Sequence, residues 1–548
     1  MNREEYSKLL LPNVKNSVAY YEELYPERKL PEGAFVTRFG PSPTGFVHMG
    51  SLYTSFACLA FARQTKGIAY LRIEDTDQKR EVEDGITGII NDFDHLEIKW
   101  DEGPTQGGKY GPYVQSERGD IYRAYARKLI IEDLAYPCFC SEEELSAQRK
   151  MQEDKKYRLG YYGRYARCRN LSMDEVINKI NNGEKYVIRM KSPGEFNKKV
   201  ILNDLIKGKI EMPENDLDHV IIKSDDGLPT YHFAHAVDDH LMHTTHVLRA
   251  DEWVSSYPIH CQMFQLLGFK LPEYGHIAPI TIKDGDSVRK LSKRKDPEAA
   301  ISYYSKLGVP NEVIKLYLAS VNNSNFEEWY TNNPDKTVED FTFEFNKMPV
   351  GGSLFDIEKL MSISRIYFSH QKSEDIYEKL LTYTKEYDPD FNKLIKTYKE
   401  KTIAILSIEK YVPRPRKDIG SYSDFKKYSW YLYDELFTGK AYEKVEIKPF
   451  YNINILTDYI NLYYDEADSK EDWFNKIKEL AGKYNFAKEV KEYKQEPEKY
   501  PGHVGDICEL IRVGITGETM TPDLYEILKV LGKKSIEKRI KLFGEYIK

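Results

Sequence analysis

The chain has 548 residues, of which 41% are hydrophobic and 30% are charged, as is typical of a globular protein with three or more domains. A net charge of −7 is not that of a non-specific nucleic-acid-binding protein. A nucleic-acid partner would therefore need a local basic face on the surface. No apolar run reaches the roughly 20 residues of a membrane span, and the N-terminus lacks the pattern of a signal peptide. Six cysteines indicate a reducing compartment. These features predict a cytoplasmic protein.

Residues 1–33 carry apolar side chains at helical spacing and end at Pro26 and Pro31. This pattern predicts a helical extension that packs on the rest of the chain.

The stretch from 34 to 51, AFVTRFGPSPTGFVHMGS, predicts a strand followed by a tight turn and a helix. The strand is residues 35–39, and the helix begins after His48. Such a turn places a helix N-terminus at the end of a strand, where an anion can bind. Small side chains at Gly50 and Ser51 would let a phosphate approach the backbone, and His48 could donate a hydrogen bond to it. A purely structural role for His48 is the alternative.

A second predicted strand, in residues 69–77, ends in the acidic cluster Glu74, Asp75 and Asp77. The carboxyl end of a strand is where α/β sheets place their ligands. The alternative interpretation is a solvated turn, or a cap for the helix predicted over 80–96.

Three cysteines in the following region, Cys138, Cys140 and Cys168, could hold zinc. Structural zinc normally has four Cys or His ligands, and no fourth is evident here, which leaves Tyr161, Tyr162 or Tyr165. Buried, reduced cysteines are the alternative.

Residues 218–253 contain another predicted strand, a turn and the string PTYHFAHAVDDHLM. Its histidines and aspartates match none of the standard zinc patterns, so no metal is predicted there. Arg249 lies at the end of the strand that follows, as Arg38 does in the first strand. Two arginines that converge on one pocket would suit a substrate with two carboxylates. After a further strand and the turn 284–286, the sequence KLSKRK at 290–295 predicts a lysine loop that binds phosphate, although a solvated loop has the same composition.

Residues 350–548 predict helix after helix, rich in tyrosine and lysine. The segment 410–437 mixes Arg414, Arg416, Lys417, Lys426 and Lys427 with aromatic residues, as an RNA-binding helix pair does. A solvated helix face over an aromatic core fits the spacing equally well.

The ordered strings TRFGPSPTGFVHMGS, LRIEDTD, PTYHFAHAVDDHLM, LRADEW and KLSKRKDPEAA resemble those of glutamyl-tRNA synthetases, which are class I aminoacyl-tRNA synthetases. The end of the chain, ITGETMTPDLYEILKVLGKKSIEKRI, resembles the close of the bacterial enzymes. The resemblance implies a Rossmann-like parallel sheet with an inserted α/β subdomain, followed by an all-α half. The implied parts are the extension 1–33, the nucleotide-binding fold in two halves (34–135 and 216–285), an insertion for the tRNA acceptor end (136–215), the lysine loop with a stem-contact region (286–349) and an anticodon-binding region (350–548).

The resemblance also implies roles for individual residues. The catalytic residues would be His48, Lys290 and Lys293. ATP would be bound by Pro41, His48, Gly50, Ser51, Glu252, Trp253, Leu291 and Lys293. Glutamate would be bound by Arg38, Gly40, Ser42, Glu74, Tyr231, His235 and Arg249, with the ammonium at Glu74 and the side-chain carboxylate at Arg249. Many relatives have Asn at the position of His235. Some members of the family bind zinc in the insertion, through a pair of cysteines like Cys138 and Cys140.

The implied function is a glutamate–tRNA ligase that uses ATP and Mg²⁺ to attach L-glutamate to tRNA-Glu, as a monomer and without a membrane. Three alternatives remain at this point. A glutaminyl-tRNA synthetase, or an enzyme that also charges tRNA-Gln, is related closely, although IEDTD favours glutamate. The truncated paralogue that modifies a tRNA base lacks the helical half. A non-catalytic tRNA-binding scaffold would show decayed motifs, and both signatures are intact here.

Overall fold

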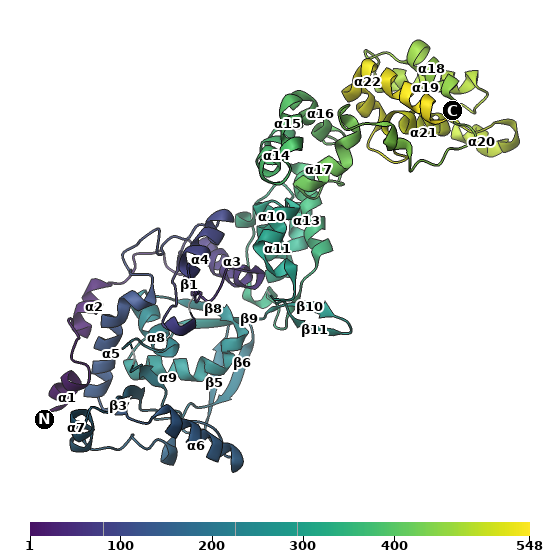
Figure 1. Cartoon of the computed structure of the whole chain (residues 1–548). Helices are drawn as coiled ribbons and strands as arrows, with labels where there is room; N and C mark the ends of the chain where they lie inside the picture. Colours follow the sequence, from purple (N-terminus) through teal and green to yellow (C-terminus); the bar gives the residue numbers. More distant parts are fainter. Residues whose placement is uncertain (81, 225, 293) are drawn as a thin grey trace. The chain divides into compact units, whose positions relative to one another are not determined.

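The computed structural model describes residues 1–80, 82–224, 226–292 and 294–548 and divides the chain into two compact units (Figure 1). The first unit consists of Met1–Tyr303 and Lys315–Asp356, and the second of Tyr304–Ile314 and Ile357–Lys548. Within these ranges, no helix has the length and apolar character needed to cross a bilayer.

The first unit is built on four parallel strands: β1 (Val36–Phe39), β2 (Ile68–Leu71), β8 (His246–Ala250) and β9 (Glu273–Ile277). β2 pairs with β1 and β9 pairs with β8. The backbone N–H of Thr245 donates to the Val36 carbonyl at 2.9 Å, which sets β8 beside β1. The spatial order is therefore β2-β1-β8-β9, and the predicted parallel sheet is confirmed.

Helices cover both faces of this sheet. The Thr37 hydroxyl donates to the Cys58 carbonyl in α3 (Met49–Gln64), whereas the next side chain, Arg38, bonds Asp239 in α8 (Tyr231–Leu241). Successive side chains of a strand point to opposite faces, so α3 and α8 lie on opposite sides of β1. The strands are accordingly buried and mostly apolar, as expected for a doubly covered parallel sheet.

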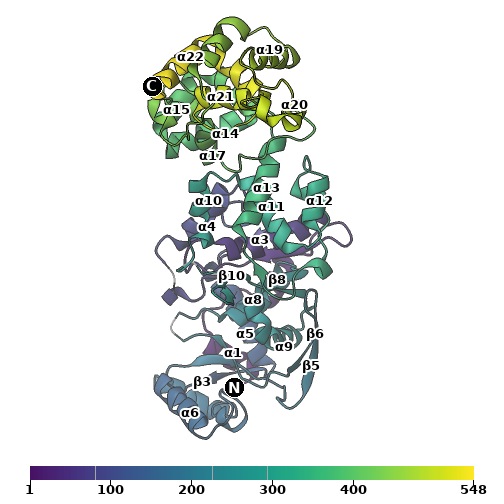
Figure 2. The same cartoon turned by 90° about the vertical axis from the view of Figure 1, so that its right-hand side faces the viewer.

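The inserted subdomain contains a three-stranded antiparallel sheet in the order β3-β4-β7, with α6 (Glu142–Asp154) and α7 (Met173–Asn181). Its strands are β3 (Ala135–Cys138), β4 (Val187–Met190) and β7 (Val220–Ile222). The sequence placed residues 219–222 in the second half of the nucleotide fold, but β7 bonds β4 instead. Figures 1 and 2 place α6 and β3 at the end of the first unit that lies away from α3 and α4 (Gly85–His95).

A hairpin of β5 (Lys199–Asp204) and β6 (Gly208–Pro213) joins the same region to the central sheet. β5 runs parallel to β9, with Asp204 opposite Tyr274, so the order continues as β6-β5-β9-β8. Without β5, β9 would expose an unpaired edge. The part of the chain assigned to the acceptor-end insertion therefore also completes the sheet on which the cavity is built.

After β9 the chain forms the hairpin of β10 (Ile280–Asp284) and β11 (Ser287–Lys290). Gly285 turns it with a φ of +62°, a conformation that glycine adopts at no steric cost. A short strand, β12 (Ser353–Leu354), runs parallel to β10.

The described residues of the second unit form helices joined by loops, with an isolated bridge between Ala487 and His503, which confirms the predicted helical half. Its longer helices are α13 (Ile357–His370), α14 (Ser373–Tyr387), α15 (Pro389–Thr397), α16 (Lys399–Ser407), α17 (Tyr422–Ser429), α19 (Lys470–Lys483), α21 (Val504–Thr516) and α22 (Leu524–Tyr546). The apolar pattern that starts at Leu524 predicts a stop at Gly532. The helix does break there, with a φ of +73°, but a further helical segment follows it.

The N-terminal residues form α1 (Arg3–Leu10) and α2 (Val18–Leu24), which pack on α5 (Gly119–Ile131). Beyond them, Arg28 donates to both Glu102 oxygens at 2.7 and 2.8 Å and to the Met242 carbonyl at 2.9 Å. Only 7% of the Arg28 side chain and 14% of the Glu102 side chain are exposed. This buried pair fastens the extension to the core of the first unit.

We expect Arg28→Ala to lower the free energy of unfolding of the first unit by about 3–5 kcal/mol, because Glu102 is left buried without its counter-charge. The matched control is Arg3→Ala, which removes a solvent-exposed pair with Asp133 and should cost under about 1 kcal/mol. Urea unfolding of the full-length chain measures both values. Equal losses of unfolding free energy in the two variants would contradict the stabilising role of the buried Arg28–Glu102 pair.

Candidate active site

A cavity of about 620 Å³ opens at the carboxyl ends of the four parallel strands. β1 contributes Arg38 and Phe39, and β8 contributes Leu248, Arg249 and Ala250. Glu74 follows β2, and the residues after Ile277 follow β9. This is the edge at which open α/β sheets bind ligands.

One wall of the cavity is the turn that leads into α3. His48 is the N-cap of this helix, and its Nδ1 accepts a hydrogen bond from the Ser51 backbone N–H at 3.0 Å. Because Nδ1 is the acceptor, the proton of the neutral ring is on Nε2. A Cβ on Gly50 would lie 3.0 Å from the His48 ring, so glycine leaves room for the side chain. A helix N-terminus and an imidazole N–H are both groups that can bind an anion.

The lysine loop lies across from this turn. The Lys290 ammonium is 2.8 Å from Glu252 Oε2, and both side chains are more than half exposed. Further along, Ala300 pairs with His48 in an antiparallel bridge. Arg289 donates to both oxygens of Asp296 at 2.7 Å, and the Ser292 N–H donates to the same carboxylate. These bonds brace the loop beside the turn. Lys293 lies outside the described residues.

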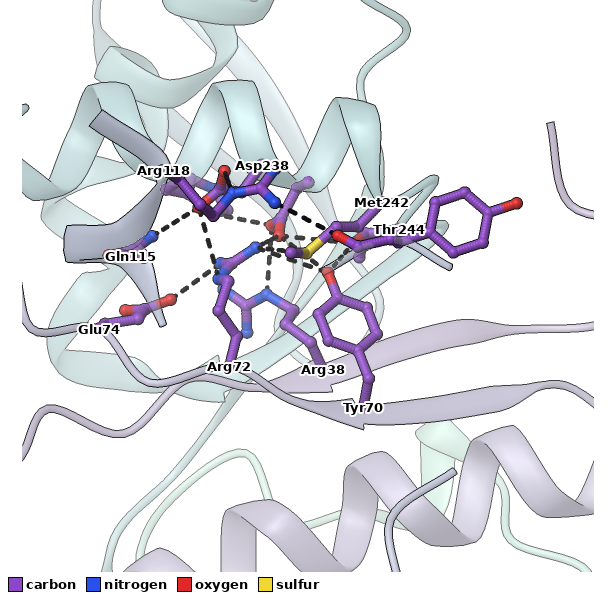
Figure 3. A network of polar contacts seen from close by, with 12 residues as sticks. Arg38, Tyr70, Arg72, Glu74, Gln115, Arg118, Asp238, Met242 and Thr244 are labelled. Atoms are coloured by element: carbon purple, nitrogen blue, oxygen red, sulfur yellow. Dashed lines mark hydrogen bonds and ion pairs between the residues drawn. The ribbon is translucent and has the colours of Figure 1, made fainter. Parts of the chain in front are cut away.

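The base of the cavity holds a network of buried charges (Figure 3). Asp239 accepts from Arg38 Nε at 3.1 Å and from Arg72 Nη1 at 2.6 Å. The second terminal nitrogen of Arg72, Nη2, donates to Glu74 Oε1 at 2.8 Å. Burial alone would lower the pKa of Arg38, but the Asp239 carboxylate outweighs it and raises the pKa above its ordinary value. Arg38 is therefore a cation that already has a counter-charge.

Gly40 makes room for the Glu74 carboxylate, because a Cβ at this position would collide with it. Burial raises the pKa of Glu74, and the nearby Arg72 and Arg38 oppose that rise. Glu74 thus faces the cavity as a desolvated carboxyl group, which an ammonium ligand would stabilise in its charged form.

Arg249 differs from Arg38 and Arg72, because its hydrogen-bond partners are neutral. Its Nε donates to His276 Nε2 at 3.0 Å, its Nη1 bonds His260 Nδ1 at 2.9 Å, and its Nη2 donates to the Trp253 carbonyl at 3.3 Å. Burial lowers the pKa of both histidines, so neither is charged at neutral pH. Among the described residues, no carboxylate forms an ion pair with Arg249, although the residue is only 4% exposed.

Arg38 and Arg72 are in direct contact with the carboxylates of Asp239 and Glu74, whereas Asp204 is separated from Arg249 by His276. A desolvated guanidinium whose contacts are all neutral favours an anionic ligand. The side-chain carboxylate of an acidic amino acid would supply that direct counter-charge.

The cavity brings together most of the residues that the sequence singled out. Those that line it are Arg38, Gly40, Pro41, Ser42, His48, Gly50, Ser51, Glu74, Tyr231, Arg249, Glu252, Trp253, Lys290 and Leu291.

His235 is placed differently from the expectation. It is fully buried, lies outside the cavity lining and bonds the Tyr274 hydroxyl at 2.8 Å, with Nδ1 2.8 Å from Asp239. It sits one layer behind Tyr231, to whose ring it is stacked. Burial lowers its pKa to about 3, so it is a neutral support of the wall.

The three candidate zinc ligands come together in the insertion. The sulfur atoms of Cys138, Cys140 and Cys168 lie within 4.8 Å of one another, and the last two are 3.7 Å apart. The Tyr161 hydroxyl is 3.3 Å from the Cys138 sulfur and 3.4 Å from that of Cys140. Tetrahedral zinc with Zn–S bonds of about 2.3 Å separates its sulfurs by roughly 3.8 Å, so the cluster has the right size. Tyr161, one of the three candidate tyrosines, therefore has its hydroxyl oxygen beside two of the three sulfurs.

Sequence reasoning missed the residues that hold the cavity residues in place. Asp239 was set aside as part of a histidine- and aspartate-rich string, and Asp204, His260 and His276 carried no motif. Their partners are remote in the sequence: Asp239 bonds Arg72 across 167 positions, and Asp204 bonds His276 across 72. The available signal was that His276 is the first residue of HIAPITI, the run that predicts a strand at 276–282.

Comparison with known proteins bears on the whole chain. Residues 34–360 match the family model described as "tRNA synthetases class I (E and Q), catalytic domain", and residues 488–543 match "Anticodon binding domain". The chain is 44% identical to the glutamate–tRNA ligase of Clostridium perfringens (strain SM101 / Type A), over 99% of its own length and 100% of the relative's. It is 42% identical to that of Acetivibrio thermocellus, over 98% and 99%.

A solved structure agrees with these relatives. It is a glutamate tRNA ligase from Elizabethkingia meningosepticum in complex with its amino acid, with a TM-score of 0.74 and 28% identity over 94% of this chain and 100% of the other. The two family models and the full-length relatives place the chain in one family: it belongs to the glutamate–tRNA ligases of the class I aminoacyl-tRNA synthetases.

Proposed function

We propose that the cavity activates L-glutamate with ATP and then transfers it to the 3′ end of tRNA-Glu. In the first step a carboxylate of glutamate attacks the α-phosphorus of ATP, which gives glutamyl-adenylate and pyrophosphate. In the second step the terminal ribose hydroxyl attacks the adenylate and AMP leaves. The observation that carries the proposal is Arg249, a buried cation whose hydrogen-bond partners are all neutral, because the side chain of glutamate would give it a counter-charge and that of glutamine would not.

ATP would lie along the turn of residues 40–51. The α3 N-terminus and the His48 Nε2–H face a developing negative charge, and Lys290 and Lys293 would approach from the opposite loop. Phosphoryl-transfer catalysis depends on such positioning and charge stabilisation, and no protein nucleophile is needed. Mg²⁺ accompanies ATP and is held chiefly by phosphates and water. Pro41, Gly50, Ser51, Glu252, Trp253 and Leu291 would complete this half of the cavity.

Glutamate would lie deeper, over the buried charges. Glu74 would take the ammonium, because Arg72 holds its carboxylate toward the cavity. Arg249 would take the side-chain carboxylate, since it lacks a counter-charge, whereas Arg38 is already paired with Asp239. Gly40, Ser42 and Tyr231 line the same space. His235 would act through Tyr231 and Tyr274, without touching the substrate.

The remaining parts would hold the tRNA: residues 136–215 its acceptor end, 286–349 its stem and the helical unit its anticodon. Charging assays with purified tRNA-Glu and tRNA-Gln test whether one or both are substrates. Esterification of neither tRNA would contradict the proposed function.

We also propose a structural zinc ion bound by Cys138, Cys140, Cys168 and Tyr161. The separations of the donor atoms support it, and the cluster closes the loop between β3 and α7. Zinc would hold this end of the insertion together and take no part in the chemistry, since the cluster and the cavity share no residue.

Arg249→Ala should raise the KM for glutamate at least about tenfold and narrow the preference over glutamine, because a charge-assisted hydrogen bond is lost. Glu74→Ala is the matched variant: it should weaken the two amino acids alike, since they share the ammonium. ATP–pyrophosphate exchange with tRNA supplied measures both. If Arg249→Ala keeps the preference for glutamate over glutamine and Arg38→Ala loses it, Arg38 is the residue that binds the side-chain carboxylate.

Two substitutions separate the roles of His48. In His48→Asn the side-chain oxygen can still cap α3, but the Nε2–H donor is lost, so kcat for adenylate formation should fall by about 10²-fold at unchanged stability. His48→Ala should lose kcat equally and also about 1 kcal/mol of unfolding free energy, because the cap is removed. A threefold or smaller loss of kcat in both variants would leave His48 as a cap alone.

Protein purified without chelator should contain about one zinc per chain, and Cys138→Ser should abolish it. Cys58→Ser provides the control, since Cys58 is a buried residue of α3 and is far in sequence from the cluster. Elemental analysis gives the stoichiometry. If the wild-type protein is fully active and free of zinc, these cysteines belong to the core.

A further inference from the structure

Arg249 is held by a chain of hydrogen bonds that begins outside the cavity. On the register of the parallel pair β8–β9, Arg249 lies directly opposite His276. Its Nε–H donates to His276 Nε2 at 3.0 Å. The guanidinium also lies over the Tyr274 ring, with its carbon 4.8 Å from the ring centre. The plane of the guanidinium is thus set by β9.

His276 is itself fixed by Asp204, the last residue of β5. The Asp204 Oδ2 lies 2.6 Å from His276 Nδ1, and both side chains are fully buried. Because Nε2 accepts from Arg249, Nδ1 must carry the proton and donate it to Asp204. Burial would raise the pKa of Asp204, but the bonds from His276 and from the Lys207 backbone outweigh this and lower it. The carboxylate is therefore ionised and selects one histidine tautomer.

Asp204 can do this because its other contacts hold it still. Its Oδ1 accepts from the backbone N–H groups of Ile206 and Lys207 at 3.0 and 2.8 Å, which caps the turn between β5 and β6. Its Oδ2 also accepts from the His276 backbone N–H at 3.1 Å. Every one of these hydrogen bonds is donated to Asp204. The position therefore requires a side chain with two oxygen atoms that both accept, as a carboxylate has.

We propose that Asp204 and His276 are positioning residues that orient Arg249 toward the glutamate carboxylate, as a relay from β5 through β9 to β8. This proposal rests on the proposed function, in which Arg249 binds that carboxylate. The relay aligns the guanidinium and leaves its charge unneutralised, because a neutral imidazole stands between it and Asp204. A carboxylate in direct contact would align Arg249 but would cancel the charge that selects glutamate.

A structural role alone makes a different prediction. If His276 only packed the sheet, its loss would lower stability without a specific effect on glutamate. Three variants of the full-length enzyme separate these readings. His276→Phe keeps an aromatic ring without an acceptor. His276→Gln keeps an amide oxygen near the position of Nε2. Asp204→Asn must turn an amide N–H toward either the capped turn or His276, and in the second case it reverses the tautomer and points a donor at Arg249.

We expect His276→Phe and Asp204→Asn to raise the KM for glutamate about tenfold or more and to narrow the preference over glutamine, as expected when a hydrogen bond to a charged group is lost. The kcat and the KM for ATP should stay within about threefold of the wild type. His276→Gln should restore the KM for glutamate to within about threefold. The control is Tyr257→Phe, which removes a bond to the Asn203 carbonyl beside His276 and should change none of these constants.

Arg249→Ala is measured in parallel, by pyrophosphate exchange with tRNA supplied. If it raises the KM for glutamate and the His276 and Asp204 variants do not, the relay is wrong and the proposed function stands. If Arg249→Ala also leaves the KM for glutamate unchanged, both the relay and the proposed function are wrong. Where His276→Phe does not fold, His276→Gln and Asp204→Asn decide: a lowered kcat at unchanged KM in Asp204→Asn overturns the relay.

Discussion

The site depends on one buried carboxylate that two arginines share. Asp239 accepts hydrogen bonds from Arg38 in β1 and from Arg72, which directly follows β2, so it brings two like charges together in the core. Burying an ion costs several kcal/mol unless it is paired and its hydrogen bonds are satisfied. Asp239 offsets this cost for both guanidiniums at once. It also fixes the position of Arg72, whose Nη2 donates a hydrogen bond to the Glu74 carboxylate and holds it at the cavity.

This arrangement explains why Arg249 can act as the selective group. Arg38 and Arg72 are in direct contact with carboxylates, whereas the hydrogen-bond partners of Arg249 are neutral. Its neighbours are imidazoles whose pKa values burial lowers, which makes them acceptors without charge. A low-dielectric surrounding strengthens the attraction between this cation and an incoming carboxylate, and it penalises an uncharged amide that leaves the cation unpaired.

Much of the site could be predicted because local sequence determines where strands end. Residues 35–39 are β-branched and aromatic, and Gly40 and Pro41 stop them, so Arg38 and the turn to His48 had to lie at the sheet edge. The same reasoning placed Glu74 and Arg249. It could not identify Asp239, Asp204 or His276, whose roles arise only when distant segments pack together. It also assigned residues 219–222 to the nucleotide fold, since a short apolar strand does not reveal its partner; β4 of the insertion provides it.

The insertion and the amino-acid site are therefore parts of one structure. An insertion must leave a sheet and return to it, and here its last hairpin returns as β5, at the edge of β9. That edge position brings Asp204 within reach of His276, and the backbone bonds that cap the β5–β6 turn end on the same carboxylate. A displacement of the hairpin would move the acceptor that sets the plane of Arg249. The hydrogen-bonded side chains of Asp204, His276 and Arg249 lie on the adjacent strands β5, β9 and β8. They thus join the segment proposed to meet the tRNA acceptor end to the group proposed to select glutamate.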